Sequence, residues 1–138
     1  MKPRLFLDAN IVLDLLGKRL PHYHSIAKIA TLADRRKLDL VVSALSYGTV
    51  NYFLEKWENS HRARDKLRKL RVISEICDLD AATVEKGLNS NFSDFEDALQ
   101  YYGAVKSACN YLITRNAKNF KLSEIPIMTA EEFLLSTD

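Results

Sequence analysis

Short apolar runs alternate along the chain with segments of helical periodicity, and this alternation restricts the fold more than any other feature. Predicted strands cover residues 5–7, 40–42, 72–76 and 111–114, with a short fifth strand at 125–128. Predicted helices cover residues 11–16, 22–36, 45–57, 60–71, 81–88, 94–107 and 130–135. Strands that alternate with helices form parallel sheets covered on both faces. The sequence therefore predicts an α/β fold, a three-layer α/β/α sandwich around a mainly parallel sheet of four to five strands.

The size and composition fit one domain covering residues 1–138, since 47% of the residues are hydrophobic. Cys77 and Cys109 lie far apart beside apolar residues and match no metal-ligand spacing, so buried reduced thiols are predicted. No signal-peptide pattern occurs, and no apolar stretch approaches the roughly 20 residues that cross a bilayer. We therefore expect a cytoplasmic protein with no membrane association.

Polar side chains stand at the ends of three predicted strands. Asp8 follows the first strand, Ser43 closes the second, Thr114 closes the fourth, and Asn116 lies just beyond it. A carboxylate at the end of a buried strand is costly unless something solvates or uses it. The carboxyl ends of parallel strands meet at one edge of the sheet, where ligands bind in open α/β folds. We therefore expect these side chains to converge on a functional site.

A second acidic group opens the helix predicted at 94–107. Ser93 and Glu96 form a capping-box pattern that places the helix start at Asp94. Asp94 and Asp97 are three residues apart and share a helix face. Acidic residues at a helix start often only complement the helix dipole, which suffices for Asp94 and Glu96. Asp97 lies in a largely apolar segment and is interpreted as a functional residue.

Carboxylates gathered on one rim would raise one another's pKa unless a cation joined them. Oxygen donors suit Mg²⁺ or Mn²⁺ rather than Zn²⁺, and the sequence contains no Cys/His cluster. We predict a Mg²⁺ (or Mn²⁺) ion held by Asp8, Asp97 and Asp94, with Asn116 as a further catalytic group. The residues predicted to orient ligands and water around them are Asn10, Ser43 and Thr114.

Three segments resemble the PIN domain family, and within it the VapC-type toxins of toxin–antitoxin pairs. They are Leu-Asp-Ala-Asn at 7–10, Asp-Ala-Leu at 97–99, and Tyr-Leu-Ile-Thr-Arg-Asn at 111–116, followed by Asn-Phe at 119–120. The resemblance extends from Lys2 to about Leu135. It implies a compact α/β/α domain, a homodimer, that hydrolyses RNA phosphodiester bonds with Mg²⁺ or Mn²⁺. It also implies a small antitoxin protein as partner and the toxin role in such a pair.

The family's functional positions correspond in this chain to Asp8, Ser43, Asp94 and Asp97. Two departures stand beside them. Thr49 occupies the position of a frequent glutamate, and Asn116 the position of a frequent aspartate after Thr-Arg. An amide binds a hard cation more weakly than a carboxylate does. The alternative function is therefore a PIN-like module that binds RNA or protein with weakened catalysis.

Another class of enzyme is excluded at the same strand end. Haloacid-dehalogenase-like phosphatases also place an aspartate after the first strand, but they carry a second one two residues later. This chain has Asn10 there, and it has no glycine-rich hinge that would complete that motif.

Positive charge is unevenly distributed, although the net charge is only +2. Residues 61–71 contain seven basic or histidine side chains, opposed only by Asp65. This segment is either a solvated helix face or a phosphate-binding surface. If RNA is the substrate, the candidate contacts to its backbone are Arg115 and Lys118 near the rim, and Arg62 and Lys66 in the basic segment.

Overall fold

Within residues 2–137, which the computed structural model describes, five parallel strands form a single sheet in the order β3-β2-β1-β4-β5. The strands are β1 (Arg4–Leu7), β2 (Asp39–Ser43), β3 (Ser74–Cys77), β4 (Tyr111–Ile113) and β5 (Ile127–Met128). Every neighbouring pair is parallel. The predicted α/β fold with a parallel sheet is confirmed.

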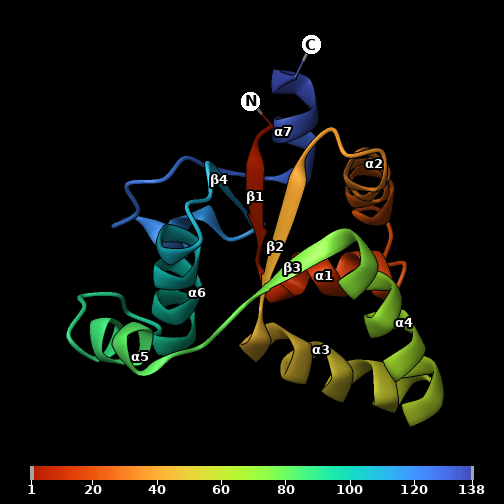
Figure 1. Ribbon diagram of the computed structural model, residues 1–138, viewed down its shortest axis with the longest axis horizontal. Helices are drawn as coiled ribbons and strands as arrows, with labels where there is room; N and C mark the ends of the chain where they lie inside the picture. Colours follow the sequence, from red (N-terminus) through yellow and green to blue (C-terminus); the bar gives the residue numbers. More distant parts are fainter. Residues whose placement is uncertain (1, 138) are drawn as a thin grey trace.

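Seven α-helices and one 3₁₀ helix cover the sheet in this part of the chain. They are α1 (Ala9–Leu16), α2 (Tyr23–Asp34), α3 (Ala44–Trp57), α4 (Ser60–Ile73), α5 (Ala81–Leu88), α6 (Phe95–Lys106), η1 (Ala117–Phe120) and α7 (Ala130–Ser136). Figure 1 shows α5 and α6 on one side of the sheet and α1 to α4 on the other. The sheet separates two hydrophobic clusters, one beneath the helices of each face.

Alternating side chains of the strands supply both clusters. In β1, Leu5 and Leu7 face the cluster that includes residues of α1, α2, α3, α4 and α7, whereas Phe6 faces the cluster under α6. All three are fully buried. Successive strand side chains point to opposite faces, so a strand covered on both faces is apolar throughout. This burial explains why the predicted strands are continuous apolar runs.

The order of the strands reverses at the centre of the sheet, between β1 and β4. The chain builds outward from β1 through β2 to β3 on one side, and through β4 to β5 on the other. Such a reversal of strand order is where open α/β sheets bind ligands, outside the carboxyl ends of the strands. Asp8 follows β1 and Thr114 follows β4, so these two residues flank the point where the strand order reverses.

Two helix starts differ from the sequence prediction. The first helix starts at Ala9 rather than at residue 11, because Asp8 is its N-cap and its carboxylate accepts a hydrogen bond from the Ala9 amide. Asp94, rather than Ser93, caps α6 and accepts from the Asp97 amide, so the helix starts at Phe95 and the predicted capping box is not formed. A carboxylate accepts from a helical N–H as well as a hydroxyl does. Both N-caps are therefore acidic residues that were predicted to belong to the functional site.

The boundary between α4 and β3 was also predicted wrongly. Residues 72–73 continue α4 instead of starting a strand. Leu70 keeps the helical spacing of the buried face, and the Ser74 hydroxyl donates to the Leu70 carbonyl at 2.7 Å. The apolar residues of this segment fit the periodicity of a helix as well as that of a strand. Packing against the rest of the protein decides in favour of the helix.

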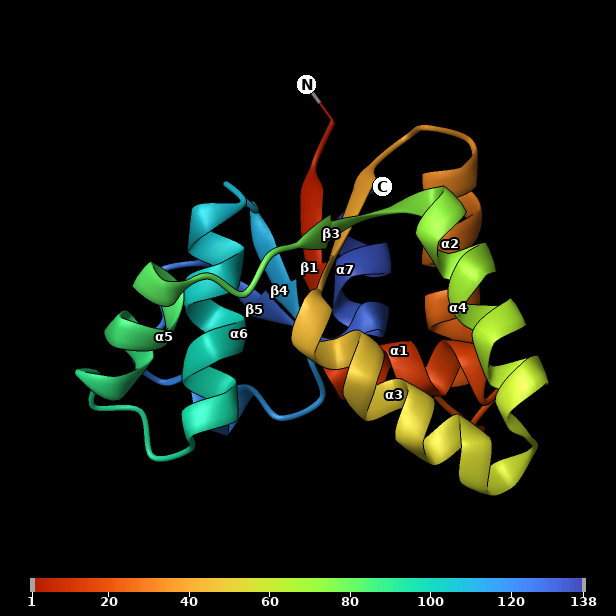
Figure 2. The ribbon, with the colours of Figure 1, turned by 60° about the horizontal axis from the view of Figure 1, so that its bottom comes forward.

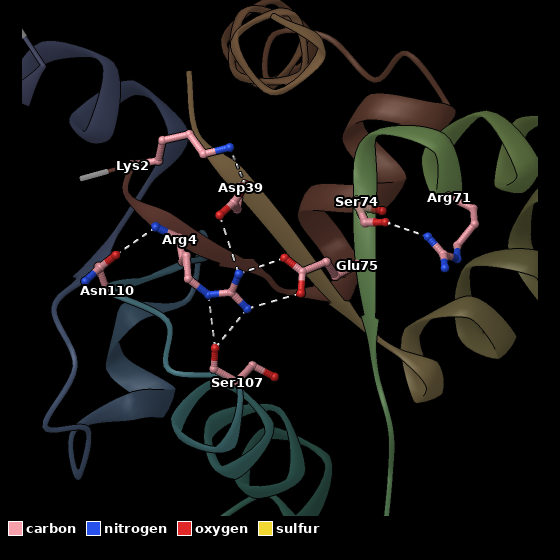
Figure 3. Close-up of polar contacts among 8 residues, drawn as sticks. All are labelled: Lys2, Arg4, Asp39, Arg71, Ser74, Glu75, Ser107 and Asn110. Atoms are coloured by element: carbon pink, nitrogen blue, oxygen red, sulfur yellow. Dashed lines mark hydrogen bonds and ion pairs between the residues drawn. The ribbon is translucent and has the colours of Figure 1, made fainter. Parts of the chain in front are cut away.

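A polar network closes the amino edge of the sheet, opposite Asp8 (Figure 3). The Arg4 guanidinium contacts Glu75 at 2.7 Å and Asp39 at 3.5 Å, and it donates to the Ser107 carbonyl at 3.0 and 3.1 Å. The Arg4 amide donates to the Asn110 side chain at 2.7 Å. One side chain thus connects β1, β2 and β3 with the end of α6.

Both cysteines are free, buried thiols, as the sequence predicted. Burial raises the pKa of the Cys109 thiol to about 12, so this side chain stays protonated at neutral pH. In the described part of the chain, no helix is both long and apolar enough to span a membrane.

Candidate active site

Asp8 is a buried carboxylate held in a fixed orientation at the carboxyl end of β1. It is 6% exposed, and its two oxygens accept hydrogen bonds from the Ala9 amide and the Thr114 hydroxyl, each at 2.8 Å. Burial raises the pKa of Asp8, while the hydrogen bonds from Thr114 and Ala9 and the charge of Arg115 oppose the rise. The side chain is therefore positioned by its neighbours rather than free to rotate.

Asp97 lies in the first turn of α6, and its environment disfavours a negative charge. Its pKa is raised to about 6, first by partial burial and then by the charges of Asp94, Asp8 and Glu96, while a hydrogen bond from Asn119 opposes the rise. Charges interact in this way only at short range. The charge of Asp8 thus acts on Asp97, although the two residues are distant in the sequence. Figure 2 shows why, since α1, α3 and α6 all begin at the same edge of the sheet.

The carboxylates do not form an all-protein metal cage. Among residues 2–137, no three His, Cys, Asp or Glu side chains are grouped as ligands of one ion. Asp94 uses one oxygen to cap α6, at 3.0 Å from the Asp97 amide. Mg²⁺ is commonly bound through one or two carboxylates, with water and substrate phosphate completing its octahedron. Two mutually repelling carboxylates with oxygen donors fit that kind of site, and the three-carboxylate site stays a prediction.

Thr114 is the residue that positions Asp8. Its hydroxyl donates to Asp8 and accepts a hydrogen bond at 3.1 Å from the amide of Asn116, the residue before η1. Thr114 is fully buried. The predicted supporting role of Thr114 therefore has a direct geometric basis. Asn116 enters this chain of contacts through its backbone.

Ser43 and Asn10 lie at the same edge as Asp8 but make different contacts. The buried Ser43 hydroxyl caps α3 and accepts from the Leu45 amide at 3.1 Å. Asn10 is half-buried in the first turn of α1, and its carbonyl accepts from Arg19 at 3.1 Å. Thr49, at the family's glutamate position, donates to the Leu45 carbonyl within its own helix at 3.4 Å.

A buried ion-pair cluster that was not predicted lies next to Asp8. Asp14 is 1% exposed and contacts Arg115 Nε at 2.9 Å and Arg19 Nη2 at 2.9 Å. The Arg115 Nη2 atom adds a second contact at 3.2 Å. This bidentate contact fixes the guanidinium that follows Thr114 and whose charge lowers the pKa of Asp8. A lone aspartate in the apolar helix at 11–16 was the available signal.

A second missed contact links the helices on either side of the site. The Gln100 amide of α6 donates to the Ser46 hydroxyl of α3 at 2.8 Å, and both side chains are buried. Ser46 is one turn after Ser43, and Gln100 is one turn after Asp97. The Gln100 side-chain oxygen is buried without a hydrogen-bond partner. The available signal was a glutamine in an otherwise apolar helix.

The predicted RNA contacts separate into two groups. Arg115 and the exposed Lys118 lie beside the strand ends. Lys66 instead contacts Glu58 at 2.7 Å and donates to the Leu16 carbonyl at 2.9 Å, and Arg62 lies 3.9 Å from Glu58. The contacts of Lys66 connect α4 to the end of α1.

Comparison with known proteins agrees with this geometry. A family model described as PIN domain matches residues 4–118, which include Asp8, Asp97 and Thr114. The chain belongs to the PIN domain family. It is 35% identical to Ribonuclease VapC1 of Aquifex aeolicus (strain VF5), over 94% of this chain and 92% of that protein. This PIN-domain protein is thus of the VapC type.

Solved structures share the fold at lower identity. A toxin–antitoxin complex from Klebsiella pneumoniae superposes with a TM-score of 0.68 at 22% identity, covering 91% of this chain and 97% of that chain. VapBC2 from Rickettsia felis, bound to a DNA fragment from its promoter, gives a TM-score of 0.65 at 20% identity, over 91% and 96% of the two chains. The PIN-domain protein therefore has the α/β fold of these toxins.

Proposed function

We propose that this protein is a VapC-type ribonuclease toxin that hydrolyses RNA phosphodiester bonds with Mg²⁺ or Mn²⁺. The observation that carries the metal assignment is the environment of Asp97 at the carboxyl edge of the sheet, where partial burial and then repulsion by the charges of Asp94, Asp8 and Glu96 raise its pKa to about 6. A divalent cation would remove this repulsion. The 35% identity to a ribonuclease supports the reaction class.

The chain's own residues hold and orient the reacting groups. Asp8 and Asp97 would bind the cation, with Asp94 contacting it directly or through water, and Thr114 keeps Asp8 in place. Once bound, the ion lowers the pKa of its water and neutralises charge on the phosphate. Arg115, fixed by Asp14, supplies a second positive charge beside Asp8. Asn116, Asn10 and Ser43 lie at the same edge as groups that can orient water and substrate.

We also propose the partners that this family type implies. Relatives were crystallised as toxin–antitoxin complexes, which supports a small antitoxin protein as the partner of this chain. We further propose that the protein forms a homodimer and acts in the cytoplasm.

A second candidate function rests on the poor carboxylate content of the site. Thr49 hydrogen bonds within its own helix, and the described residues form no three-acid cluster. These observations favour a PIN-like module that binds RNA or protein but cleaves RNA weakly. Metal binding separates the two functions, because a vestigial site binds Mn²⁺ poorly.

Cleavage of RNA tests the proposed reaction. Purified protein should cleave single-stranded or structured RNA with Mg²⁺ or Mn²⁺, and excess chelator should abolish cleavage. Asp8→Asn and Asp97→Asn should each lower the rate at least about a hundredfold, because each removes a carboxylate from the cation. The matched control is Asp78→Asn, the same change at an exposed position outside the site. Activity that survives both substitutions, or that persists in chelator, would contradict the assignment.

A further inference from the structure

The basic helix α4 has two flanks on either side of its buried face. Ala63 and Leu70 point into the core. At 3.6 residues per turn, basic side chains fall into two groups. The first flank carries Arg62, Lys66 and Lys69. The second flank, which we call the arginine flank, carries Arg64, Arg68 and Arg71.

Two of the three side chains of the first flank make contacts within the protein. Lys66 contacts Glu58 at 2.7 Å and the Leu16 carbonyl at 2.9 Å, and Arg62 lies 3.9 Å from the same glutamate. A lysine with a carboxylate and a carbonyl as partners has little left to offer a phosphate. The first flank therefore serves to anchor α4.

The arginine flank borders an open groove between α3 and α4. The groove measures about 280 Å³, and the residues that line it are Tyr47, Arg64, Leu67, Arg68 and Arg71. Arg71 donates to the Ser74 carbonyl at 3.1 Å, the contact drawn in Figure 3. Arg68 contacts Asp65 at 2.8 Å. Asp65 is thus a partial counter-charge to Arg68, whereas Arg71 donates to a neutral carbonyl.

The groove combines positively charged side chains with one aromatic residue. Tyr47 and Leu67 are only partly buried, and they pack against the hydrophobic cluster that includes residues of α1, α2, α3, α4 and α7. Arginine binds phosphate through charge-assisted hydrogen bonds, and aromatic rings stack on bases. A single RNA strand uses both the arginines and the ring, whereas an acidic polypeptide uses only the arginines. RNA is therefore the better fit.

The position of the groove connects it with the candidate active site. Tyr47 lies one turn after Ser43, at the start of α3. Figure 2 shows α3 between α4 and α6, so the groove lies beyond the helix that borders the site. We propose that this groove is an RNA subsite, which holds backbone phosphates and a base of the substrate away from the cleaved bond. This inference rests on the proposed ribonuclease function.

Binding of a labelled single-stranded RNA in chelator, where no cleavage occurs, tests the subsite. Arg64→Gln/Arg68→Gln is compared with Arg62→Gln/Lys69→Gln, which removes the same charge from the first flank of the same helix. The first variant should bind roughly tenfold more weakly at low salt. Losing two phosphate contacts should also reduce the slope of log K against log salt by about 1.4. The second variant should stay within about twofold of wild type. Tyr47→Leu should weaken binding without changing the slope, because stacking is uncharged.

Three results would overturn the subsite. Equal weakening by both double variants would mean that only net charge matters. Unchanged binding by Arg64→Gln/Arg68→Gln would mean that RNA does not enter the groove. Loss of poly-L-glutamate binding with RNA binding retained would assign the groove to an acidic polypeptide. Any of these results alongside RNA cleavage by wild type leaves the proposed function intact, whereas wild type that neither binds nor cleaves RNA contradicts the function itself.

Discussion

Asp97 is the residue at which the site's electrostatics can be measured most directly. Its pKa is raised to about 6 in the folded protein, whereas an aspartate in the unfolded chain titrates near 3.8. Between these values the folded state binds a proton that the unfolded state does not, so this group's contribution to the free energy of unfolding decreases as pH rises from about 4 to 7. The ionised Asp97 therefore destabilises the metal-free protein at neutral pH.

Asp97→Asn should remove this pH-dependent contribution. In chelator at pH 7.5 the variant should be as stable as wild type, or more stable by up to about 1 kcal/mol, since solvent screens a half-buried charge. At pH 4 the difference should disappear. Urea unfolding at both pH values measures it, with Asp78→Asn as the exposed control. A loss of more than about 1 kcal/mol at pH 7.5 would mean that Asp97 is a structural hydrogen-bonding residue.

Single residues show where sequence reasoning succeeds and where it fails. Asp8 could be predicted, because a carboxylate that ends an apolar strand is conspicuous. The bidentate contact of Asp14 with Arg115 could not, because it joins residues 101 positions apart. The capping role of Asp94 was missed since several acceptors in the segment 93–97 could cap the same helix.

At the scale of elements, a buried hydrogen bond joins α3 and α6, the helices that begin beside Ser43 and Asp97. The Ser46–Gln100 hydrogen bond lies one turn behind Ser43 and Asp97. Gln100→Leu should destabilise the protein by about 1–3 kcal/mol, because it leaves the buried Ser46 hydroxyl without its partner. It should also lower kcat roughly 10- to 100-fold, because small displacements of catalytic groups are costly.

A double variant separates positioning from stability. Ser46→Ala/Gln100→Leu replaces both polar groups with apolar ones and should recover most of the stability. It should not recover kcat, since nothing then fixes the distance between the helices. Thermal melts and cleavage kinetics measured on the same samples provide both values. Full recovery of both would show that the link is only structural.

Elements were predictable where local signals agreed. Helix α5 covers residues 81–88 as predicted, and Asp80 caps it. The end of α4 was not predictable, since Val72 and Ile73 fit a strand as well as a helix and only packing decides between them. Burial against neighbouring elements is the information that a local pattern lacks.

For the whole molecule, the parallel sheet followed from alternation, but the strand order did not. The order depends on long-range pairings, such as Leu5 with both Leu40 and Tyr111. Since every strand is parallel, all carboxyl ends meet at one edge in any order. The convergence of Asp8 and Thr114 was therefore predictable, whereas their position on either side of the reversal in strand order required the structure.

Metal binding couples the site to the stability of the whole molecule. A cation that binds only the folded state stabilises it by about 2.7 kcal/mol at a hundredfold excess over Kd. For a domain of this size the Tm should therefore rise by about 10 °C as Mn²⁺ is added, and the rise should saturate. Asp8→Asn should abolish it and Asp78→Asn should not. The rise should be smaller at pH 5 than at pH 7.5, because protons compete for Asp97, whose pKa is about 6. An unsaturable rise, or the same rise in Asp8→Asn, would place the ion elsewhere and favour the module with weakened catalysis.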